Sequence, residues 1–298
     1  MQGLYDDVSF FLISYVNTLA LKIAGIKIRI DSPIALERFN DFGFYKDFIV
    51  KDSSFFHCRL LHRIGAPQDA LKARELFRTQ NWQLLSSGNK MVLRVGPCNK
   101  RNKPDNVVVF DRGYREGVIY QQSVFELFRR FIDQFLIINL LSRNKGFLLH
   151  SSGVVWQNKG ICFTGLSGTG KSTLLDLFKN EVASDCLLND DRCALRNYGL
   201  RWRVFGTPWF GESRVSSSRG ADLSAVFFIR HSKRNYVRRL SAPQLCPSLM
   251  VLGLLPLWDH RATARVLATF QNLIQNVPAF ELGFVPGKAA VDLIKKTL

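Results

Sequence analysis

Several features that identify large classes of proteins are missing from this sequence. None of its six cysteines stands in a Cys-x-x-Cys pair, the common spacing of structural zinc sites and dithiol redox sites. The apolar run at residues 8–16 is too short for a membrane-spanning helix, which needs about 20 such residues. Asp6 and Asp7 precede that run, where a signal peptide carries positive charge. We therefore expect a cytoplasmic protein with reduced thiols and no membrane partner.

Acidic residues are scarce, with 24 Asp and Glu against 41 Lys and Arg, so the formal net charge is +17. The positive excess is spread over both halves of the chain, which argues against a basic tail. The sequence also lacks an aromatic RNA-binding motif, zinc-finger spacing and a basic leucine zipper. We expect an anionic partner, such as a phosphate group or an acidic protein surface, and no nucleic acid.

The first part of the chain shows short apolar runs broken by polar clusters. Residues 26–30 and 91–95 alternate between apolar and polar side chains, as half-buried strands do, and 107–110 form a third apolar run. A short helix is predicted over 70–78 and a basic loop over 97–104. The pattern predicts an N-terminal, β-rich α+β domain over residues 1–118.

The rest of the chain, residues 119–298, predicts a second domain of mixed strands and helices. A long amphipathic helix is expected over 123–142, because its aromatic and aliphatic residues recur at helical spacing. A strand hairpin follows, with strands at 147–156 and 161–164 and a tight turn at 157–160. Further strands are expected at 186–188, 202–205, 225–230 and 236–240, and helices at 263–277 and 289–298. The predicted fold class is α/β, with a mixed sheet.

A glycine-rich segment lies between the second strand of that hairpin and a predicted helix. It matches the pattern G-x-x-x-x-G-K-[ST] and consists of Gly165, Leu166, Ser167, Gly168, Thr169, Gly170, Lys171 and Ser172, followed by Thr173. In such loops the glycines let backbone N–H groups point at phosphate oxygens, and the positive end of the helix adds to the attraction. The lysine reaches the β- and γ-phosphates, and the serine hydroxyl reaches Mg²⁺. The sequence therefore predicts that these residues bind a nucleoside triphosphate, ATP with Mg²⁺.

Two adjacent carboxylates, Asp190 and Asp191, follow the predicted strand at 186–188. One carboxylate in such a place can hold Mg²⁺ while the other accepts a proton from an attacking hydroxyl. Neighbouring side chains on an extended strand point to opposite faces, so both serve one site only if the chain turns there. A capping or surface pair is the alternative. His150, at the end of the strand ahead of the hairpin turn, is a third candidate.

In combination these features resemble the bacterial HPr kinase/phosphorylase family, whose kinases share a nucleotide-binding core with phosphoenolpyruvate carboxykinase. Members of that family have a histidine ahead of a hairpin, a loop of this form, and an Asp-Asp pair after the next strand. All three occur here in that order, and the resemblance covers residues 120–245. It implies a P-loop kinase core of that type over 119–298, with ATP and Mg²⁺ as cofactors and a hydroxyl group as acceptor.

The resemblance also implies roles for individual residues. Lys171 would bind the phosphates, Ser172 and Asp190 would ligate Mg²⁺, and Asp191 would be the general base, although which aspartate is the base stays open. His150 would lie near the phosphates, so the expected catalytic residues are His150, Lys171, Asp190 and Asp191.

The family's Glu-x-Arg-Gly-Leu-Gly segment has no match after the Asp pair, and the N-terminal part does not look like the family's regulatory domain. Glu212 is the candidate replacement for the metal-binding glutamate, and Arg214 or Arg219 for neutralising transferred charge. HPr itself is therefore not the expected acceptor. We expect a serine of a protein or peptide, and an acidic peptide would suit the basic chain.

Two alternatives remain open from the sequence: a non-catalytic ATP-binding regulatory module, and a kinase of a small-molecule hydroxyl such as free serine. A GTPase is disfavoured because no Asn-Lys-x-Asp segment follows the loop, and an ABC-type ATPase because no Leu-Ser-Gly-Gly-Gln signature is present. A carboxykinase is disfavoured because the chain is short for one. The sequence leaves a homo-oligomer open.

Overall fold

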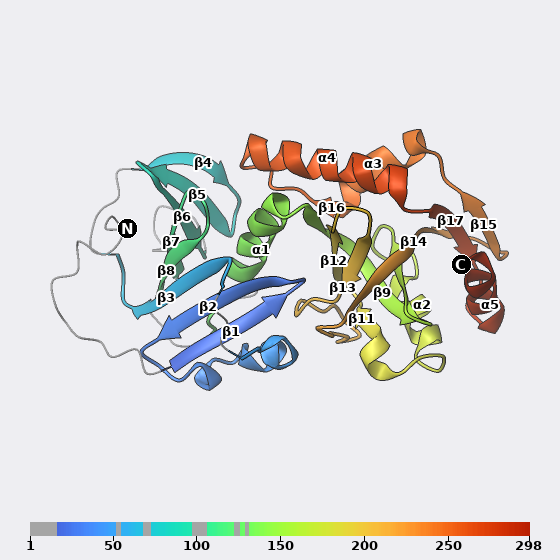
Figure 1. The fold of residues 1–298 in the computed structure, drawn as a ribbon, viewed down its shortest axis with the longest axis horizontal. Helices are drawn as coiled ribbons and strands as arrows, with labels where there is room; N and C mark the ends of the chain where they lie inside the picture. The colour runs from blue at the N-terminus through green and yellow to red at the C-terminus, as the bar shows by residue number, and fades with distance from the viewer. Residues whose placement is uncertain (1–16, 52–54, 68–72, 97–105, 122–125, 129–130) are drawn as a thin grey trace. The chain divides into compact units, whose positions relative to one another are not determined.

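The computed structural model describes residues 17–51, 55–67, 73–96, 106–121, 126–128 and 131–298 (Figure 1). Four sequence predictions fall wholly or partly outside these ranges: the apolar run at 8–16, the basic loop at 97–104, and parts of the helices predicted at 70–78 and 123–142. Within the described residues no helix is both long and apolar enough to cross a membrane.

The described chain divides into two compact units. The first contains residues 17–20, 28–42 and 58–127, and the second contains 21–27, 43–57 and 128–298, with the gaps given above. The predicted boundary at residues 118 and 119 remains a prediction about domains. The fold class is as expected, because each unit contains a mixed sheet and helices accompany the second.

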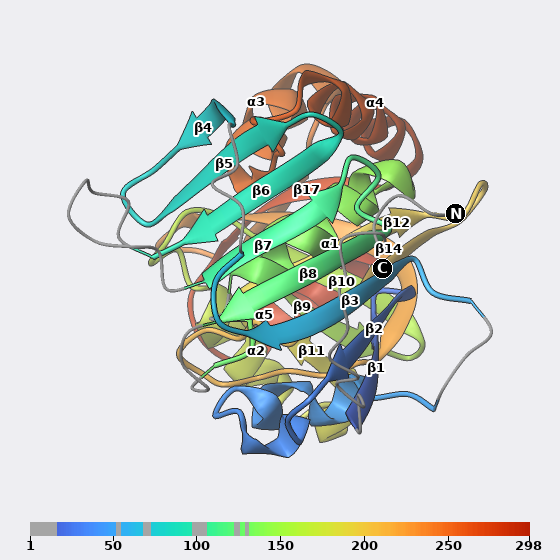
Figure 2. The same ribbon diagram turned by 90° about the vertical axis from the view of Figure 1, so that its left-hand side faces the viewer.

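The first unit is built on an eight-stranded sheet in the order β1-β2-β3-β8-β7-β6-β5-β4, which Figure 2 shows side by side. Its strands are β1 (Asn17–Ile23), β2 (Ile26–Ser32), β3 (Cys58–Ile64), β4 (Arg74–Arg78), β5 (Trp82–Ser87), β6 (Lys90–Val95), β7 (Asn106–Asp111) and β8 (Glu116–Gln121). Two short 3-10 helices, Leu36–Arg38 and Phe42–Phe48, lie between β2 and β3 in sequence. β3 pairs in parallel with β2 and β8, whereas β4 to β8 form an antiparallel meander.

The strands predicted at 26–30, 91–95 and 107–110 are confirmed as β2, β6 and β7. The helix predicted over 70–78 is wrong for its described part, which is strand β4. This segment pairs antiparallel with β5, and Phe77 stacks on Trp82 with ring centroids 5.1 Å apart. Cross-strand pairing and aromatic packing therefore outweigh a weak local helix preference.

The second unit is built on a nine-stranded sheet. Its strands are β9 (Gly146–Trp156), β10 (Lys159–Thr164), β11 (Leu187–Asn189), β12 (Arg192–Asn197), β13 (Trp202–Phe205), β14 (Gly220–His231), β15 (Tyr236–Arg239), β16 (Gly253–Leu254) and β17 (Ala279–Phe284). The main order is β10-β9-β12-β13-β14-β17-β15, and β10 also pairs with β14. This extra pairing closes β10, β9, β12, β13 and β14 into a ring. Because β10, β14 and β17 run parallel, their carboxyl ends lie at one edge of the sheet.

In its described residues the second unit also has five α-helices and a short 3-10 helix, Ser184–Cys186. The α-helices are α1 (Ile132–Arg143), α2 (Lys171–Phe178), α3 (Ala242–Leu252), α4 (His260–Asn276) and α5 (Lys288–Thr297). One hydrophobic core joins α3 and α4 to the sheet through residues such as Leu249 and Phe270. A second core joins α2 and α5 to it through residues such as Phe178 and Ile294. Helices therefore cover both faces of this sheet, and the segment between β10 and α2 lies at its edge.

Most of the second unit follows the sequence prediction, including the turn at Gln157 and Asn158. Their φ angles of 49° and 62° belong to the left-handed region that tight hairpin turns require. The helix predicted over 123–142 begins too early, because α1 starts at Ile132. Residues 126–128 are not helical, although Phe128 is buried and accounts for the apolar pattern. Strands β12, β16 and β17 and helix α3 were not predicted.

Candidate active site

The glycine-rich loop connects the carboxyl end of β10 to the first turn of α2, as the motif requires. Gly168 and Gly170 have φ angles of 79° and 102°, which a residue with a side chain adopts only under strain. At Gly170 a Cβ atom would also lie 2.8 Å from Cζ of Phe284 on β17. The sequence therefore needs glycine at 170 for two reasons, backbone conformation and the close approach of a packed ring.

Lys171 begins α2 and is buried, with 7% of its surface exposed. Its ammonium donates hydrogen bonds to the carbonyl oxygens of Gly165, at 2.9 Å, and Leu166, at 3.0 Å. Burial lowers the pKa of Lys171, and the charge of Asp191 opposes this shift. The lysine thus lies within the loop, with a carboxylate in its electrostatic environment. Ser172 and Thr173 follow on the exposed side of the first helical turn.

His150 and Asp191 meet beside the loop. β9 pairs with β12 so that His150 lies opposite Arg192, and the backbone N–H of Ser151 donates to the carbonyl of Asp191 at 3.0 Å. This pairing places Nδ1 of His150 3.0 Å from Oδ1 of Asp191, while the guanidinium of Arg192 lies 3.3 Å from Oδ2. The carbonyl of His150 accepts a hydrogen bond from Thr164, the last residue of β10, at 2.8 Å.

Burial opposes ionisation of the Asp191 carboxyl. The hydrogen bond from His150 and the charges of Arg192, His150 and Lys171 outweigh it, so the pKa of Asp191 lies below its ordinary value. Asp191 is therefore an ionised carboxylate at neutral pH. It forms one electrostatic cluster with His150 and with the loop lysine.

The Asp190 carboxylate does not join the His150–Asp191 pair and instead stabilises the turn at residues 211–213. Both of its carboxylate oxygens accept backbone N–H groups, from Gly211 at 2.8 Å and from Ser213 at 2.7 Å. The residue is only 4% exposed. Asn189, the residue before it, accepts the backbone N–H groups of Asp191 and Arg192 at 2.7 and 2.6 Å. The chain turns at the aspartate pair, yet the two carboxylates have different partners.

The turn that Asp190 holds also carries Glu212, which is exposed. Arg214 follows, exposed and with a φ of 53°. Arg219 is committed elsewhere, since its guanidinium lies 2.6 Å from a carboxylate oxygen of Asp185. Of the two arginines considered from the sequence, Arg214 is therefore the one that stays available near the aspartate pair.

The magnesium ligands expected from the sequence are Ser172, Asp190 and Glu212. In the part of the chain that the structure describes, no three His, Cys, Asp or Glu side chains gather in a metal-binding group. Mg²⁺ is often held by one or two protein oxygens together with nucleotide phosphates and water, which the exposed Ser172 and Glu212 fit. Asp190 fits less well, because both of its oxygens already accept hydrogen bonds. The ligand set stays a prediction.

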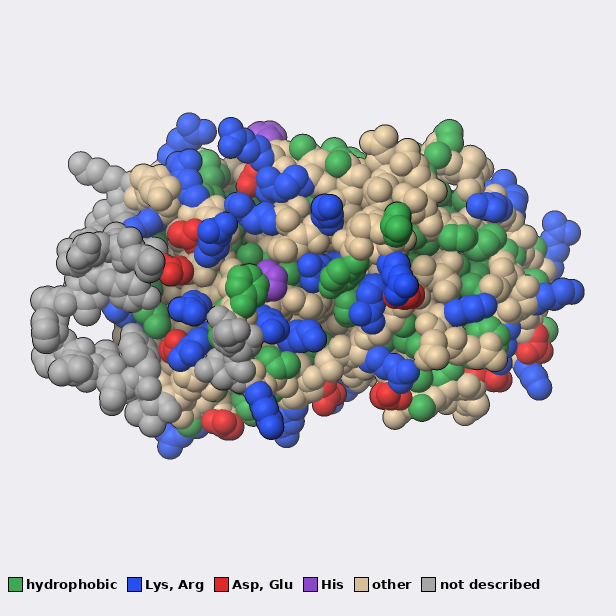
Figure 3. All heavy atoms as spheres, in the orientation of Figure 1, with side chains coloured by type: hydrophobic (Ala, Val, Ile, Leu, Met, Phe, Trp, Pro, Cys, Tyr) green, Lys and Arg blue, Asp and Glu red, His purple; other side chains and the backbone are tan. Residues whose placement is uncertain are grey.

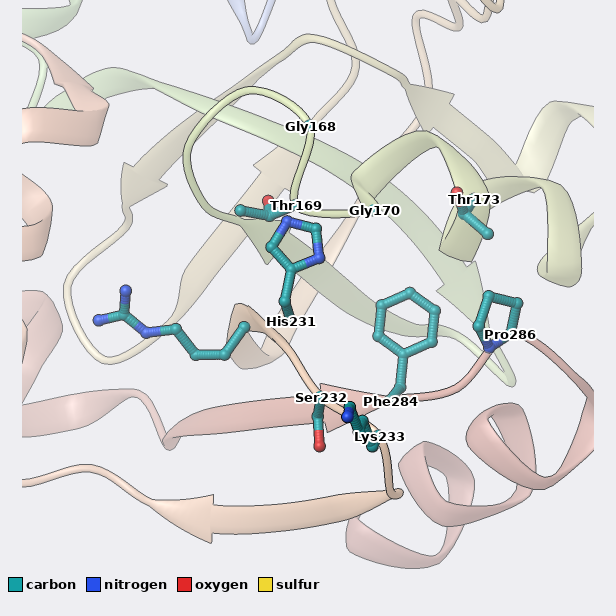
Figure 4. A pocket seen from close by; sticks show the side chains of 10 residues that line it. Gly168, Thr169, Gly170, Thr173, His231, Ser232, Lys233, Phe284 and Pro286 are labelled. Atoms are coloured by element: carbon teal, nitrogen blue, oxygen red, sulfur yellow. The ribbon is translucent and has the colours of Figure 1, made fainter.

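A cavity of about 560 Å³ opens beside the loop, at the ends of β14 and β17. Its lining residues are Gly168, Thr169, Gly170, Thr173, Arg230, His231, Ser232, Lys233, Phe284 and Pro286. Figure 4 shows the His231 ring pointing toward Thr169, and the Phe284 ring pointing toward the segment between Gly170 and Thr173. The cavity is therefore basic, with one aromatic wall.

This basic wall was not among the site residues predicted from the sequence. A signal was present, because the run Arg230-His231-Ser232-Lys233-Arg234 follows directly after an apolar strand. What could not be read was that β14 lies in parallel beside β10, which brings the run to the glycine-rich loop.

No protein-family model matches the chain, and no curated protein matches it at a significant level. Among solved structures, the HPr(Ser) kinase/phosphatase from Coxiella burnetii is similar to it. The alignment has 12% sequence identity and a TM-score of 0.29, and it covers 50% of this chain and 95% of that chain. This is a distant structural relationship, and a TM-score this low carries no argument about function.

Proposed function

We propose that this protein is an ATP- and Mg²⁺-dependent kinase that transfers the γ-phosphoryl group to a hydroxyl, a serine of a protein or peptide. The observation that carries the proposal is the cluster of Lys171, His150 and Asp191. The Lys171 ammonium, which would bind phosphate, and the ionised carboxylate of Asp191 influence each other's pKa. Nδ1 of His150 lies 3.0 Å from Oδ1 of Asp191 and orients that carboxylate. A protein that only bound a nucleotide would not need that carboxylate.

In the proposed reaction the triphosphate lies on the N–H groups of the glycine-rich loop. Lys171 exchanges its hydrogen bonds to Gly165 and Leu166 for bonds to phosphate oxygens, which costs little because the ammonium is already buried there. The nucleoside would occupy the cavity beside Phe284 and Thr173. The aromatic wall can stack on a base, and the cations can hold ribose or phosphate oxygens.

The acceptor oxygen forms a bond to the γ-phosphorus while the bond from that phosphorus to the β–γ bridging oxygen breaks, and ADP leaves. Asp191 accepts the hydroxyl proton, and His150 holds its carboxylate in place. Ser172 and Glu212, together with the phosphates, would hold Mg²⁺, and the bound ion would supply positive charge near the leaving group. Asp190 positions the turn that carries Glu212 and Arg214 and does not itself take the proton.

The test is ATP turnover with Mg²⁺ and a library of seryl peptides, comparing the wild type with Asp191→Asn. We expect the variant to bind ATP with similar affinity and to lose transfer by at least about a hundredfold, the usual contribution of a general base. Full turnover by the Asp191→Asn variant would contradict the assignment of Asp191 as the general base. ATP binding without transfer in the wild type would favour the alternative, a regulatory ATP-binding module. Transfer to free serine alone would favour a small-molecule kinase.

A further inference from the structure

Helix α3 is apolar on the side that faces solvent as well as on the side that faces the core. Leu245, Leu249 and Leu252 are buried. An exposed row lies between them at helical spacing, and we call it the outer stripe: Pro243, Cys246, Pro247, Met250 and Val251. Val251 is 70% exposed and Met250 42%. Gln244 and Ser248 are the only polar residues of α3, and a helix that is apolar on two sides normally has both of them covered, so the outer stripe is a candidate docking surface.

The charge next to the outer stripe has one sign. No Asp or Glu occurs from residue 223 to residue 258. Strand β15 leads directly into α3 and carries the exposed Arg238 and Arg239, while the turn before it carries Lys233 and Arg234. Figure 3 shows Lys and Arg side chains gathered where Figure 1 places β15 and β17.

Part of this charge is unbalanced. Glu281 on β17 lies 3.1 Å from Arg238, but Arg234 and Arg239 have no ion pair within the described residues. The positive amino end of α3, which starts at Ala242, adds to the field of these arginines. An occupant that contacts both the outer stripe and these arginines would therefore combine apolar groups with negative charge.

A second copy of this chain fits these conditions poorly. Two copies would bring like-charged arginines together, and each chain has a net charge of +17. The outer stripe is also short, with five residues on one helix, whereas a stable dimer buries about 800 Å² from each partner. A bilayer needs no matching groove, and shallow insertion of a convex apolar helix combined with attraction to anionic headgroups is enough for reversible binding.

We propose that the outer stripe of α3, together with Arg234 and Arg239, forms a docking surface for an anionic lipid bilayer. Met250 and Val251 enter the boundary between headgroups and acyl chains, and the two arginines contact lipid phosphates or carboxylates. This departs from the expectation of no membrane partner that the sequence suggested. It is independent of the proposed kinase function, since none of these residues lies in the Lys171 cluster.

The test is co-sedimentation of the full chain with phosphatidylcholine vesicles, with and without phosphatidylserine. We expect binding to the anionic vesicles only, weakening as salt is raised. The paired substitutions Met250→Asp with Val251→Asp, and separately Arg234→Gln with Arg239→Gln, should each reduce binding at least about tenfold. Leu200→Asp is the matched control, because Leu200 is 102% exposed in a turn of the same unit and should leave binding unchanged.

Three results would overturn the proposal. Equal binding to neutral and anionic vesicles, or none to either, would contradict the role of charge. Full binding by the Met250 and Val251 variant would contradict insertion of the stripe. A wild-type dimer that this variant converts to a monomer, by light scattering, would assign the stripe to self-association. Circular dichroism serves as the folding control for both variants, and if the helix variant misfolds, the arginine variant still tests the role of charge.

Discussion

Asp190 and Asp191 are neighbours in sequence, but replacing them should have different effects. Replacing Asp190 should lower the stability of the fold, whereas replacing Asp191 should lower phosphoryl transfer. In Asp190→Asn one amide NH₂ would face a backbone N–H that now donates to a carboxylate oxygen, from Gly211 at 2.8 Å or Ser213 at 2.7 Å. The variant loses one charge-assisted hydrogen bond and leaves a buried donor unpaired, a loss of about 2–4 kcal/mol in the free energy of unfolding. For a unit of this size that lowers the melting temperature by roughly 5–10 °C.

The assay is thermal unfolding by circular dichroism with and without Mg-ATP, and Asp191→Asn is the matched control. The Asp191 side chain is partly exposed, at 20%, so its loss should cost at most about 1 kcal/mol. A melting temperature within 1 °C of wild type for Asp190→Asn would refute the anchoring role. So would a larger destabilisation by Asp191→Asn than by Asp190→Asn.

Three further predictions concern other residues. Lys171→Ala should weaken ATP binding at least about tenfold in calorimetry, because it removes the buried cation that meets the phosphates; unchanged affinity would place the nucleotide elsewhere. Gly170→Ala should lower the free energy of unfolding in chemical denaturation more than Gly168→Ala does. Both glycines have positive φ, but only at Gly170 would the added Cβ lie 2.8 Å from the Phe284 ring. Equal losses for the two variants would argue against the ring contact. Burial lowers the pKa of His62 to about 4 against 6.5 when unfolded, so the free energy of unfolding should fall by about 3 kcal/mol as pH drops from 6.5 to 4. His62→Gln should lose that part of the pH dependence, and an unchanged profile would contradict the burial argument.

The parts of the site that could be predicted are those that local sequence determines. The glycine positions follow from the backbone conformation of the loop. The turn at Gln157 and Asn158 follows from residues that tolerate positive φ, and it brings β9 alongside β10. His150 and Thr164 become neighbours through this hairpin alone.

The parts that could not be predicted depend on contacts between distant segments. Asp190 stabilises a turn through the backbone N–H groups of Gly211 and Ser213, which are more than twenty residues away in sequence. No local sequence pattern indicates these partners. The basic cavity wall at Arg230–Lys233 depends on the parallel pairing of β14 with β10. The Asp pair looked like one chemical unit, whereas the turn after Asn189 gives each carboxylate its own partners.

We propose that this chain transfers the γ-phosphoryl group of ATP to a hydroxyl and that Asp191 takes the proton. The most direct measurement is mass spectrometry of seryl peptides and cellular proteins incubated with γ-labelled ATP, Mg²⁺ and either the wild type or Asp191→Asn. We expect labelled phosphoserine with the wild type and at least about a hundredfold less with the variant, at similar ATP affinity. Labelling that is equal for both proteins, or ATP binding by the wild type with no label on any acceptor, would contradict it.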